Sequence, residues 1–359
     1  MRWLTVILIL PYVIVLLKNY RSLLRNKIFK ISTDPKTFIS VVIACRNEEK
    51  NLPAILNCIA LQNYPDNLFE VFIVDDNSSD KTFELSEAFK GIRNVYVLNN
   101  KGRGKKQALR TGILAAKGHL IITTDADCAM GKNWIRTITA FYEMNHPDLI
   151  ICPVQLESSH GFFGRFQELE FISLQGITAG SALSDNSTMC NGANLAFTRE
   201  AYLNHFGDLH DEINSGDDIF LLQSLKKDRN SRILWLESAD AIVTADSQTA
   251  AGSFLKQRSR WISKVGSYSD RYTIAIGIVT LIATLLQISL MIGCVIYPVL
   301  IWTFLLVFVL KSVPDFLILL NTSGRYNKRN LLWWFLPSQL IYPFYVLSII
   351  FYLLIFREE

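Results

Sequence analysis

The chain has 359 residues, of which 50% are hydrophobic, with a formal net charge of +4 and a positive mean hydropathy. This length provides about two domains at roughly 150 residues each, and the composition is too apolar for an ordinary soluble protein. The basic residues that flank the apolar segments largely explain the net charge, and no basic stripe is interleaved with aromatic residues, which argues against nucleic-acid binding. The six cysteines form no CxxC pair, which argues against a zinc site and disulfides.

Apolar segments lie at both ends of the chain. Residues 1–20 contain an apolar run followed by basic residues and no small-residue cleavage site, so we expect a retained signal anchor rather than a cleaved signal peptide. A second apolar region covers residues 274–320, which is long enough for two membrane-spanning helices of about 20 residues each. Residues 331–356 provide one more. We therefore expect a transmembrane domain of about three helices over residues 272–356.

Basic residues indicate how these spans are oriented. They cluster after the first span, before the second and between the third and the fourth. Positive residues mark the cytoplasmic side, and all three clusters agree on a topology with residues 18–271 in the cytoplasm. The polar middle of the chain is therefore expected at the cytoplasmic face of a membrane.

Strand-like and helix-like patterns alternate after the anchor. The strand-like runs cover residues 37–45, 70–76, 94–98 and 119–125. Such alternation predicts an α/β fold with a parallel sheet and right-handed crossovers. Ligands of such sheets bind beyond the carboxyl ends of the strands.

Three of these four strands end in acidic or polar residues. The first is followed by Glu48, the second ends at Asp75 and Asp76, and the fourth ends at Asp125 with Asp127 beyond it. One carboxylate can simply cap a helix, but convergence at several strand ends favours a ligand site. A divalent cation relieves the repulsion between close carboxylates and shares its other positions with phosphate and water. Asp125 and Asp127 therefore predict a metal–diphosphate site, with a nucleotide as the source of the diphosphate.

Two common nucleotide motifs are absent. The first strand is not followed by GxGxxG, and a GxxxxGK[ST] loop fails at Asn99 and Lys106. The glycines and lysines at residues 101–106 can still steady a phosphate at a helix N-terminus. A solvated basic loop explains them equally well.

Two further motifs lie nearer the second span. Asp217 and Asp218 precede an amphipathic run, where one suits a helix cap and the other a general base. Gln257 and Trp261 are four residues apart, so on a helix they would share one face.

Together the motifs resemble those of membrane-bound glycosyltransferase family 2, which includes cellulose, hyaluronan and poly-N-acetylglucosamine synthases and ceramide glucosyltransferases. The family pattern of Asp, Asp-x-Asp, an acidic pair and Gln-x-x-Arg-Trp stands here as Asp75-Asp76, Asp125-Ala126-Asp127, Asp217-Asp218 and Gln257-Arg258-Ser259-Arg260-Trp261. The resemblance covers residues 37–271. It implies a cytoplasmic GT-A (Rossmann-like) domain there, with one N-terminal and about three C-terminal transmembrane helices.

The resemblance also implies a UDP-sugar as the donor. Glu48 and the pair Asp75-Asp76 would hold the uridine, with one carboxylate accepting from the uracil N–H. Lys105 matches a lysine of the family's GK loop.

The metal ligands and the base follow in the same way. Asp125 and Asp127 would hold Mg²⁺ or Mn²⁺ on the diphosphate, with Asp127 as the principal ligand. Asp218 aligns with the family's catalytic base, and Asp217 precedes it.

The last motif would lie over the donor and the acceptor. Gln257, Arg260 and Trp261 form it, with Arg260 near the diphosphate and the indole offering a face to a sugar. The chain departs from the family at Gly216, where Thr is common, and at Arg110, where Asn is common.

The acceptor remains open between two kinds. Four spans leave little room for a channel that could carry a growing polysaccharide. This favours transfer to a membrane lipid or a lipid-linked glycan at the bacterial inner membrane. The alternative is a processive polysaccharide synthase of the poly-N-acetylglucosamine or cellulose type, to which an accessory membrane subunit would belong. A non-catalytic nucleotide-sensing membrane protein is a further alternative, although such a protein is not expected to keep both Asp127 and Asp218. Lys311 and Asp315 can pair on one helix face, or reach the membrane interface from a helix end.

Overall fold

The computed structural model describes residues 2–158, 161–210, 212–213 and 215–356, so Met1 of the predicted anchor lies outside the described residues. The chain divides into two compact units. We call the first the sheet unit, which comprises Lys27–Gln155 and Met189–Asp246. We call the second the helical unit, which comprises Met1–Asn26, Leu156–Thr188 and Ser247–Glu359.

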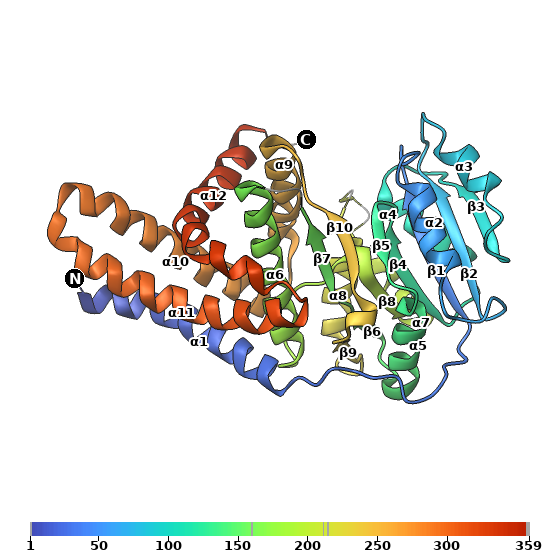
Figure 1. Cartoon of the computed structure of the whole chain (residues 1–359), viewed down its shortest axis with the longest axis horizontal. Helices are drawn as coiled ribbons and strands as arrows, with labels where there is room; N and C mark the ends of the chain where they lie inside the picture. Colours follow the sequence, from blue (N-terminus) through green and yellow to red (C-terminus); the bar gives the residue numbers. More distant parts are fainter. Residues whose placement is uncertain (1, 159–160, 211, 214, 357–359) are drawn as a thin grey trace. The chain divides into compact units, whose positions relative to one another are not determined.

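The sheet unit is built on a seven-stranded sheet in the order β3-β2-β1-β4-β8-β6-β9 (Figure 1). Its strands are β1 (Ile39–Cys45), β2 (Phe69–Asp75), β3 (Val95–Asn99), β4 (Leu120–Asp125), β6 (Leu149–Ile151), β8 (Leu195–Thr198) and β9 (Ile233–Trp235). The first four pair in parallel, as the alternating pattern predicts. Strand β8 then runs antiparallel to both β4 and β6.

Helices and a smaller sheet complete this unit. The helices are α2 (Leu52–Ala60), α3 (Thr82–Ala88), α4 (Lys105–Ala115), α5 (Trp134–Asn145), α7 (Arg199–Asn204) and α8 (Asp217–Lys227). The smaller sheet has the order β5-β10-β7, with β5 (Cys128–Met130), β10 (Val243–Asp246) and β7 (Val154–Glu157).

The core lies on both faces of the parallel strands. Helix α2 buries Leu52, Ile55 and Ile59, which share one helix face at a spacing of three and four residues. On α4, a Cβ at Gly112 would lie 2.5 Å from Val42 Cγ1, so only glycine lets this helix approach the sheet so closely. This close packing fixes the N-terminus of α4 at the carboxyl edge of the sheet.

The helices of the helical unit are α1 (Arg2–Arg25), α6 (Phe162–Ala182), α9 (Ala251–Ile262), α10 (Arg271–Ile296), α11 (Ile301–Arg325) and α12 (Phe335–Ile355). Figure 1 shows α1, α10 and α11 running side by side. Within the part of the chain that the structure describes, four segments are long and apolar enough to cross a bilayer: Trp3–Arg25, Arg271–Ile296, Pro298–Arg325 and Arg329–Ile355. One is N-terminal and three are C-terminal, as predicted, and together they indicate a membrane protein.

Helix α6 lies within the predicted 37–271 segment but packs inside the helical unit. A Cβ at Gly176 would meet Ile318 and Thr322 of α11 at 2.5 Å, and one at Gly180 would meet Asn19 of α1 at 2.8 Å. Small residues at these two positions therefore bring α6 close to two apolar helices.

The ionisable pair of α11 is buried in the middle of its helix. Lys311 Nζ donates to Asp315 Oδ2 at 2.9 Å and to Gln339 Oε1 at 3.0 Å, and Tyr12 Oη donates to Asp315 Oδ1 at 2.5 Å. The alternative of a helix-end pair reaching the interface is therefore wrong, because both side chains are buried between α1, α11 and α12. A buried pair of this kind persists only when it is fully hydrogen-bonded.

Candidate active site

The sheet register brings two predicted aspartates to one place. Asp75 of β2 pairs with Cys45, and Asp125 of β4 pairs with Ala44. The two acids therefore flank the carboxyl end of β1, where ligands of parallel sheets bind.

Hydrogen bonds between two loops hold Glu48 near Asp75 and Asp125. Asn47 and Asn77 both adopt a left-handed backbone, which asparagine tolerates better than most residues. Asn47 N–H donates to Ser78 Oγ at 2.9 Å, and Glu48 N–H donates to Thr82 Oγ1 at 2.7 Å. These bonds tie the loop after β1 to the loop after β2 and fix the backbone of Glu48.

Asp75 and Asp76 have different surroundings. Asp76 accepts hydrogen bonds from Asn100 Nδ2 at 2.6 Å and from the Gly104 N–H at 2.9 Å. Asp75 Oδ2 accepts from the Ser78 N–H at 3.1 Å, but the buried Oδ1 has no hydrogen-bond partner among the described residues. A buried acceptor without a partner is costly, so Oδ1 of Asp75 is suited to an N–H group of a ligand.

The predicted metal ligands form an excess of negative charge. Lys105 makes an ion pair with Asp125. Asp127 retains solvent exposure, yet the protein atoms around its carboxyl group partly bury it, and this burial together with the charge of Asp125 raises its pKa. Burial, followed by the charges of Asp127 and Asp125, also raises the pKa of Glu48. The three carboxylates therefore lie close enough to repel one another.

The acidic pair at the start of α8 meets the same lysine. Asp218 Oδ2 accepts from the Gly192 N–H at 3.0 Å, and Oδ1 accepts from the Ile219 N–H at 2.8 Å. A Cβ at Gly192 would lie 3.6 Å from Asp217 Oδ2 and 3.7 Å from Lys105 Nζ. Although burial opposes it, the charge of Asp125, followed by those of Asp217 and Asp218, raises the pKa of Lys105. Lys105 thus links the acids of β4 to those of α8.

Two glycines with positive φ precede the helices that carry these groups. Gly104, at φ 89°, precedes Lys105 in α4, and Gly216, at φ 92°, precedes Asp217 in α8. Side chains rarely adopt such a backbone, so glycine at each position lets the chain turn directly into the helix.

The donor set at the strand ends fits a hard divalent cation. Among the residues that the structure describes, no group of three or more His, Cys, Asp or Glu side chains is arranged to hold a metal. Magnesium needs only one or two carboxylates when a substrate diphosphate and water complete its shell, and Asp125 and Asp127 supply these. Burial, followed by the charges of Asp125 and Asp127, raises the pKa of the Cys128 thiol, which therefore adds no thiolate to this oxygen set.

The last motif belongs to the helical unit. Gln257, Arg260 and Trp261 all lie on α9, as the spacing predicts. Arg260 is exposed, whereas Gln257 and Trp261 are half-buried. Their action together with the acids of the sheet unit stays a prediction.

Sequence reasoning did not predict which groups hold the acids in place. Asn100 and Gly104 hold Asp76, and Gly192 holds Asp218. Gly104 could have been found as the residue before Lys105, but the sequence carried no signal for Asn100.

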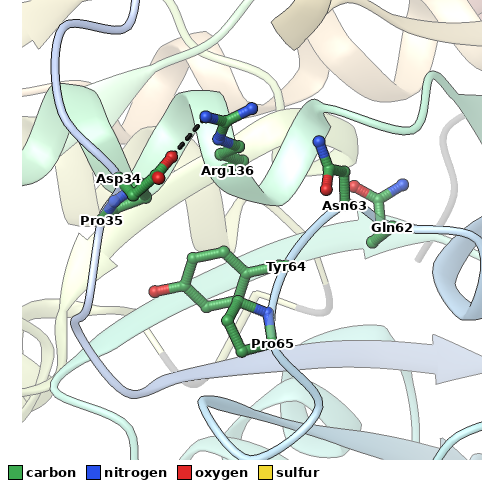
Figure 2. Close-up of a pocket in the computed structure, with 7 residues that line it drawn as sticks. All are labelled: Asp34, Pro35, Gln62, Asn63, Tyr64, Pro65 and Arg136. Carbon is green, nitrogen blue, oxygen red and sulfur yellow. Dashed lines mark hydrogen bonds and ion pairs between the residues drawn. The ribbon is translucent and has the colours of Figure 1, made fainter.

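A cavity of about 510 Å³ lies elsewhere in the sheet unit (Figure 2). It is lined by Asp34, Pro35, Gln62, Asn63, Tyr64, Pro65 and Arg136. Tyr64 Oη donates to the carbonyl of Thr37, just before β1, at 2.6 Å, so this cavity lies at the amino ends of the strands. It shares no residue with the acidic cluster.

The sheet is of the α/β class, and the acids at its carboxyl edge form a candidate ligand site. Residues 40–206 match the family model of glycosyl transferase family 2, so the chain carries a domain of this family. The expected α/β GT-A fold, with one N-terminal and three C-terminal apolar helices, is confirmed.

Known proteins resemble parts of the chain. The poly(ribitol-phosphate) beta-N-acetylglucosaminyltransferase TarS of Staphylococcus aureus is 29% identical over 126 residues, which are 34% of this chain and 22% of that protein. An undecaprenyl-phosphate 4-deoxy-4-formamido-L-arabinose transferase of Aeromonas hydrophila is 42% identical over 105 residues, or 27% of this chain and 30% of that protein. The matched regions thus span less than a third of either relative.

One solved structure matches the whole chain. It is the mannosyltransferase PcManGT from Pyrobaculum calidifontis in complex with GDP-Man and Mn²⁺, with a TM-score of 0.57 over 100% of both chains. At 15% sequence identity this likeness shows the fold alone.

Proposed function

We propose that the protein is an inverting glycosyltransferase that moves a sugar from a UDP-sugar to a membrane lipid or a lipid-linked glycan. The observation that carries this proposal is the convergence of Asp125, Asp127 and Asp218 around Lys105, with Asp75 at the same edge of the sheet, within a family 2 domain. The four apolar helices support an acceptor that resides in a membrane. The basic flanks support catalysis at the cytoplasmic face. The membrane would be a bacterial inner membrane.

The donor nucleotide would bind at the ends of β1 and β2. The unpartnered Oδ1 of Asp75 is suited to accept from the uracil N–H. Asp76 already accepts hydrogen bonds from Asn100 and Gly104, so its role would be to shape the loop before Lys105. The carboxylate of Glu48 would lie next to the ribose.

Asp125 and Asp127 would hold Mg²⁺ or Mn²⁺. When bound, this cation would offset the negative charge of the donor diphosphate. Lys105 would add its fixed positive charge at the same place.

Asp218 would act as the general base. Each of its oxygens accepts one backbone N–H, which orients the carboxylate and leaves acceptor capacity for a proton. It would take the proton of an acceptor hydroxyl while that oxygen attacks the anomeric carbon. The bond between the anomeric carbon and the diphosphate breaks in the same step, so the configuration inverts. A positioned base of this kind typically contributes about 100- to 10,000-fold in rate.

The relatives support two acceptor classes. The Aeromonas protein is named for undecaprenyl-phosphate, which is a lipid, and TarS is named for poly(ribitol-phosphate), which is a glycan-type polymer. Four apolar segments offer little room for a growing polysaccharide, so we favour single transfer to a lipid or lipid-linked acceptor. A processive synthase working with an accessory subunit is the second candidate.

The test uses the purified full-length chain in lipid nanodiscs. It is incubated with a panel of radiolabelled UDP-sugars and GDP-mannose, with Mn²⁺, Mg²⁺ or chelator, in native membrane lipid extract. We expect metal-dependent release of UDP and label in the solvent-extracted lipid fraction. Label in a solvent-insoluble polymer would favour the synthase. Tight UDP binding without turnover of any donor would overturn the enzyme assignment in favour of a sensor.

A further inference from the structure

Arg258, which follows the predicted site residue Gln257, is a buried cation held by two other helices. Its guanidinium donates from Nη2 to Glu170 Oε2 at 2.6 Å and from Nε to Glu170 Oε1 at 3.3 Å. Tyr345 Oη also donates to Glu170 Oε1, at 3.1 Å. Arg258 and Glu170 are only 3% and 8% exposed, so this is a desolvated, bidentate pair that joins α9 to α6 and α12.

The same guanidinium contacts two residues of the last predicted motif. Its Nη1 donates to Gln257 Oε1 at 2.8 Å. Its Cζ lies over the Trp261 ring, 4.1 Å from the centroid, and over the Phe254 ring, 4.8 Å from the centroid. Phe254 in turn stacks on Tyr345 of α12, with ring centroids 5.3 Å apart.

We propose that Arg258, anchored by Glu170, is a positioning residue that orients Gln257 and Trp261 for sugar transfer. This inference rests on the proposed function. Because the carboxamide oxygen of Gln257 is taken by Arg258, its NH₂ group is the end left to donate to a sugar or acceptor hydroxyl. The guanidinium under the indole likewise restricts the rotation of the Trp261 ring.

Arginine suits this position better than lysine. The planar fork donates to Glu170 and Gln257 at once and stacks on the rings, whereas an ammonium group is a compact charge without a stacking face. Lysine would therefore keep the charge opposite Glu170 and lose the geometry. Arg258→Lys separates the two contributions.

A purely structural role is the competing explanation, and the chain offers a matched control. Lys328 Nζ makes a partly buried ion pair at 2.8 Å with Glu168, which lies on the same helix as Glu170. None of the hydrogen bonds of Lys328 reaches Gln257, Arg260 or Trp261. Lys328→Met thus removes an ion pair between α6 and the turn after α11, away from the predicted motif.

The kinetic test compares Arg258→Lys, Glu170→Gln and Lys328→Met in nanodiscs, with the most active donor of the panel. For the first two we expect kcat to fall roughly 10- to 100-fold, while donor KM changes by less than about twofold. Arg258→Lys should add little to the loss already caused by the double variant Gln257→Ala, Trp261→Ala. For Lys328→Met we expect a lower Tm with kcat within about twofold of the wild type. Equal kcat losses at equal Tm losses would overturn the proposal, as would a wild-type kcat for Arg258→Lys.

A second readout does not depend on activity. In protein labelled with 5-fluorotryptophan, the ¹⁹F resonance of Trp261 is assigned by its loss in Trp261→Phe. Arg258→Lys should shift or broaden this resonance, and Lys328→Met should leave it unchanged. If no donor is turned over, the proposed function fails, and this resonance alone still decides the positioning role. An unshifted resonance in Arg258→Lys would overturn it.

Discussion

Lys105, at the start of α4, makes an ion pair with Asp125, at the end of β4. The carboxylate expected to bind a cation is thus neutralised by a side chain of the protein itself. A divalent cation that reaches Asp125 competes with this lysine, and the displaced ammonium becomes available to a diphosphate.

Replacing Lys105 should therefore change metal and nucleotide affinity in opposite directions. We expect Lys105→Met to bind Mn²⁺ more tightly without nucleotide and to bind UDP more weakly with Mn²⁺ present. Isothermal titration of the purified full-length chain measures both. Lys101→Met, an exposed lysine of the same loop, serves as the control and should leave both affinities within about twofold. Weaker metal binding in Lys105→Met would contradict the exchange.

Asp127 should oppose the stability of the protein before the metal binds. Its pKa is raised by burial and by Asp125, so the folded state holds this proton more tightly than the unfolded state. Stability from this group is then fully present below the unfolded pKa and is lost as pH rises through the folded pKa. We expect Asp127→Asn to raise the Tm of the ligand-free protein at pH 7 and to lose this advantage in acid.

The same substitution should abolish metal-dependent UDP binding. Asp66→Asn, an exposed acid of the sheet unit, should change neither Tm nor binding. If chelator affects UDP binding equally in the wild type and in Asp127→Asn, the assignment of Asp127 as a metal ligand is wrong.

Asp218→Asn should separate binding from chemistry. An asparagine keeps an oxygen to accept one of the two backbone N–H groups, so the start of α8 should persist. It cannot take a proton from the acceptor, so we expect transfer to fall about 100- to 10,000-fold with UDP affinity unchanged. Titration with UDP and initial rates of transfer test this, and a normal rate would place the base elsewhere.

Gly216 should tolerate no side chain at its present backbone angle. Its φ of 92° precedes both acids of α8, and a residue with a Cβ costs about 1–2 kcal/mol in this region. We expect Gly216→Ala to lower both Tm and kcat. Gly207→Ala is the matched control, because a Cβ there meets nothing within 4 Å. A similar loss of Tm in both variants would contradict the role of the backbone angle.

Replacing only one residue of the buried pair of α11 should destabilise the protein more than replacing both. Lys311→Met leaves Asp315 buried without its cation, at a cost of about 3–5 kcal/mol. Lys311→Met combined with Asp315→Leu removes both charges and should recover much of this loss. Thermal unfolding in nanodiscs measures the difference, and additive losses would show that the two side chains are not coupled.

The carboxyl edge of the sheet was predictable because local patterns determine it. Long β-branched runs mark β1, β2 and β4, and parallel pairing then brings Asp75 and Asp125 together. The antiparallel strands β6 and β8 span only three and four residues, which is too short for a periodic signal. Their order depends on tertiary packing.

Contacts between segments that are distant in the sequence could not be predicted either. Arg258 looks like one more basic residue near a membrane, and only the folded chain pairs it with Glu170, 88 positions away. Nothing local distinguishes α6 as a member of the helical unit, because its packing depends on Asn19 and Thr322 at distant positions.

The chain changes unit four times, near residues 26, 155, 188 and 246. The sheet unit therefore holds all of its residues once translation has passed Asp246, while the helical unit still awaits α9, α10, α11 and α12. During synthesis, α1 and α6 are made before α10 and α11, although α1 packs against both and α6 packs against α11. A chimera that exchanges donor specificity must accordingly be spliced at several of these crossings, and grafting at one junction would separate α6 from its neighbours.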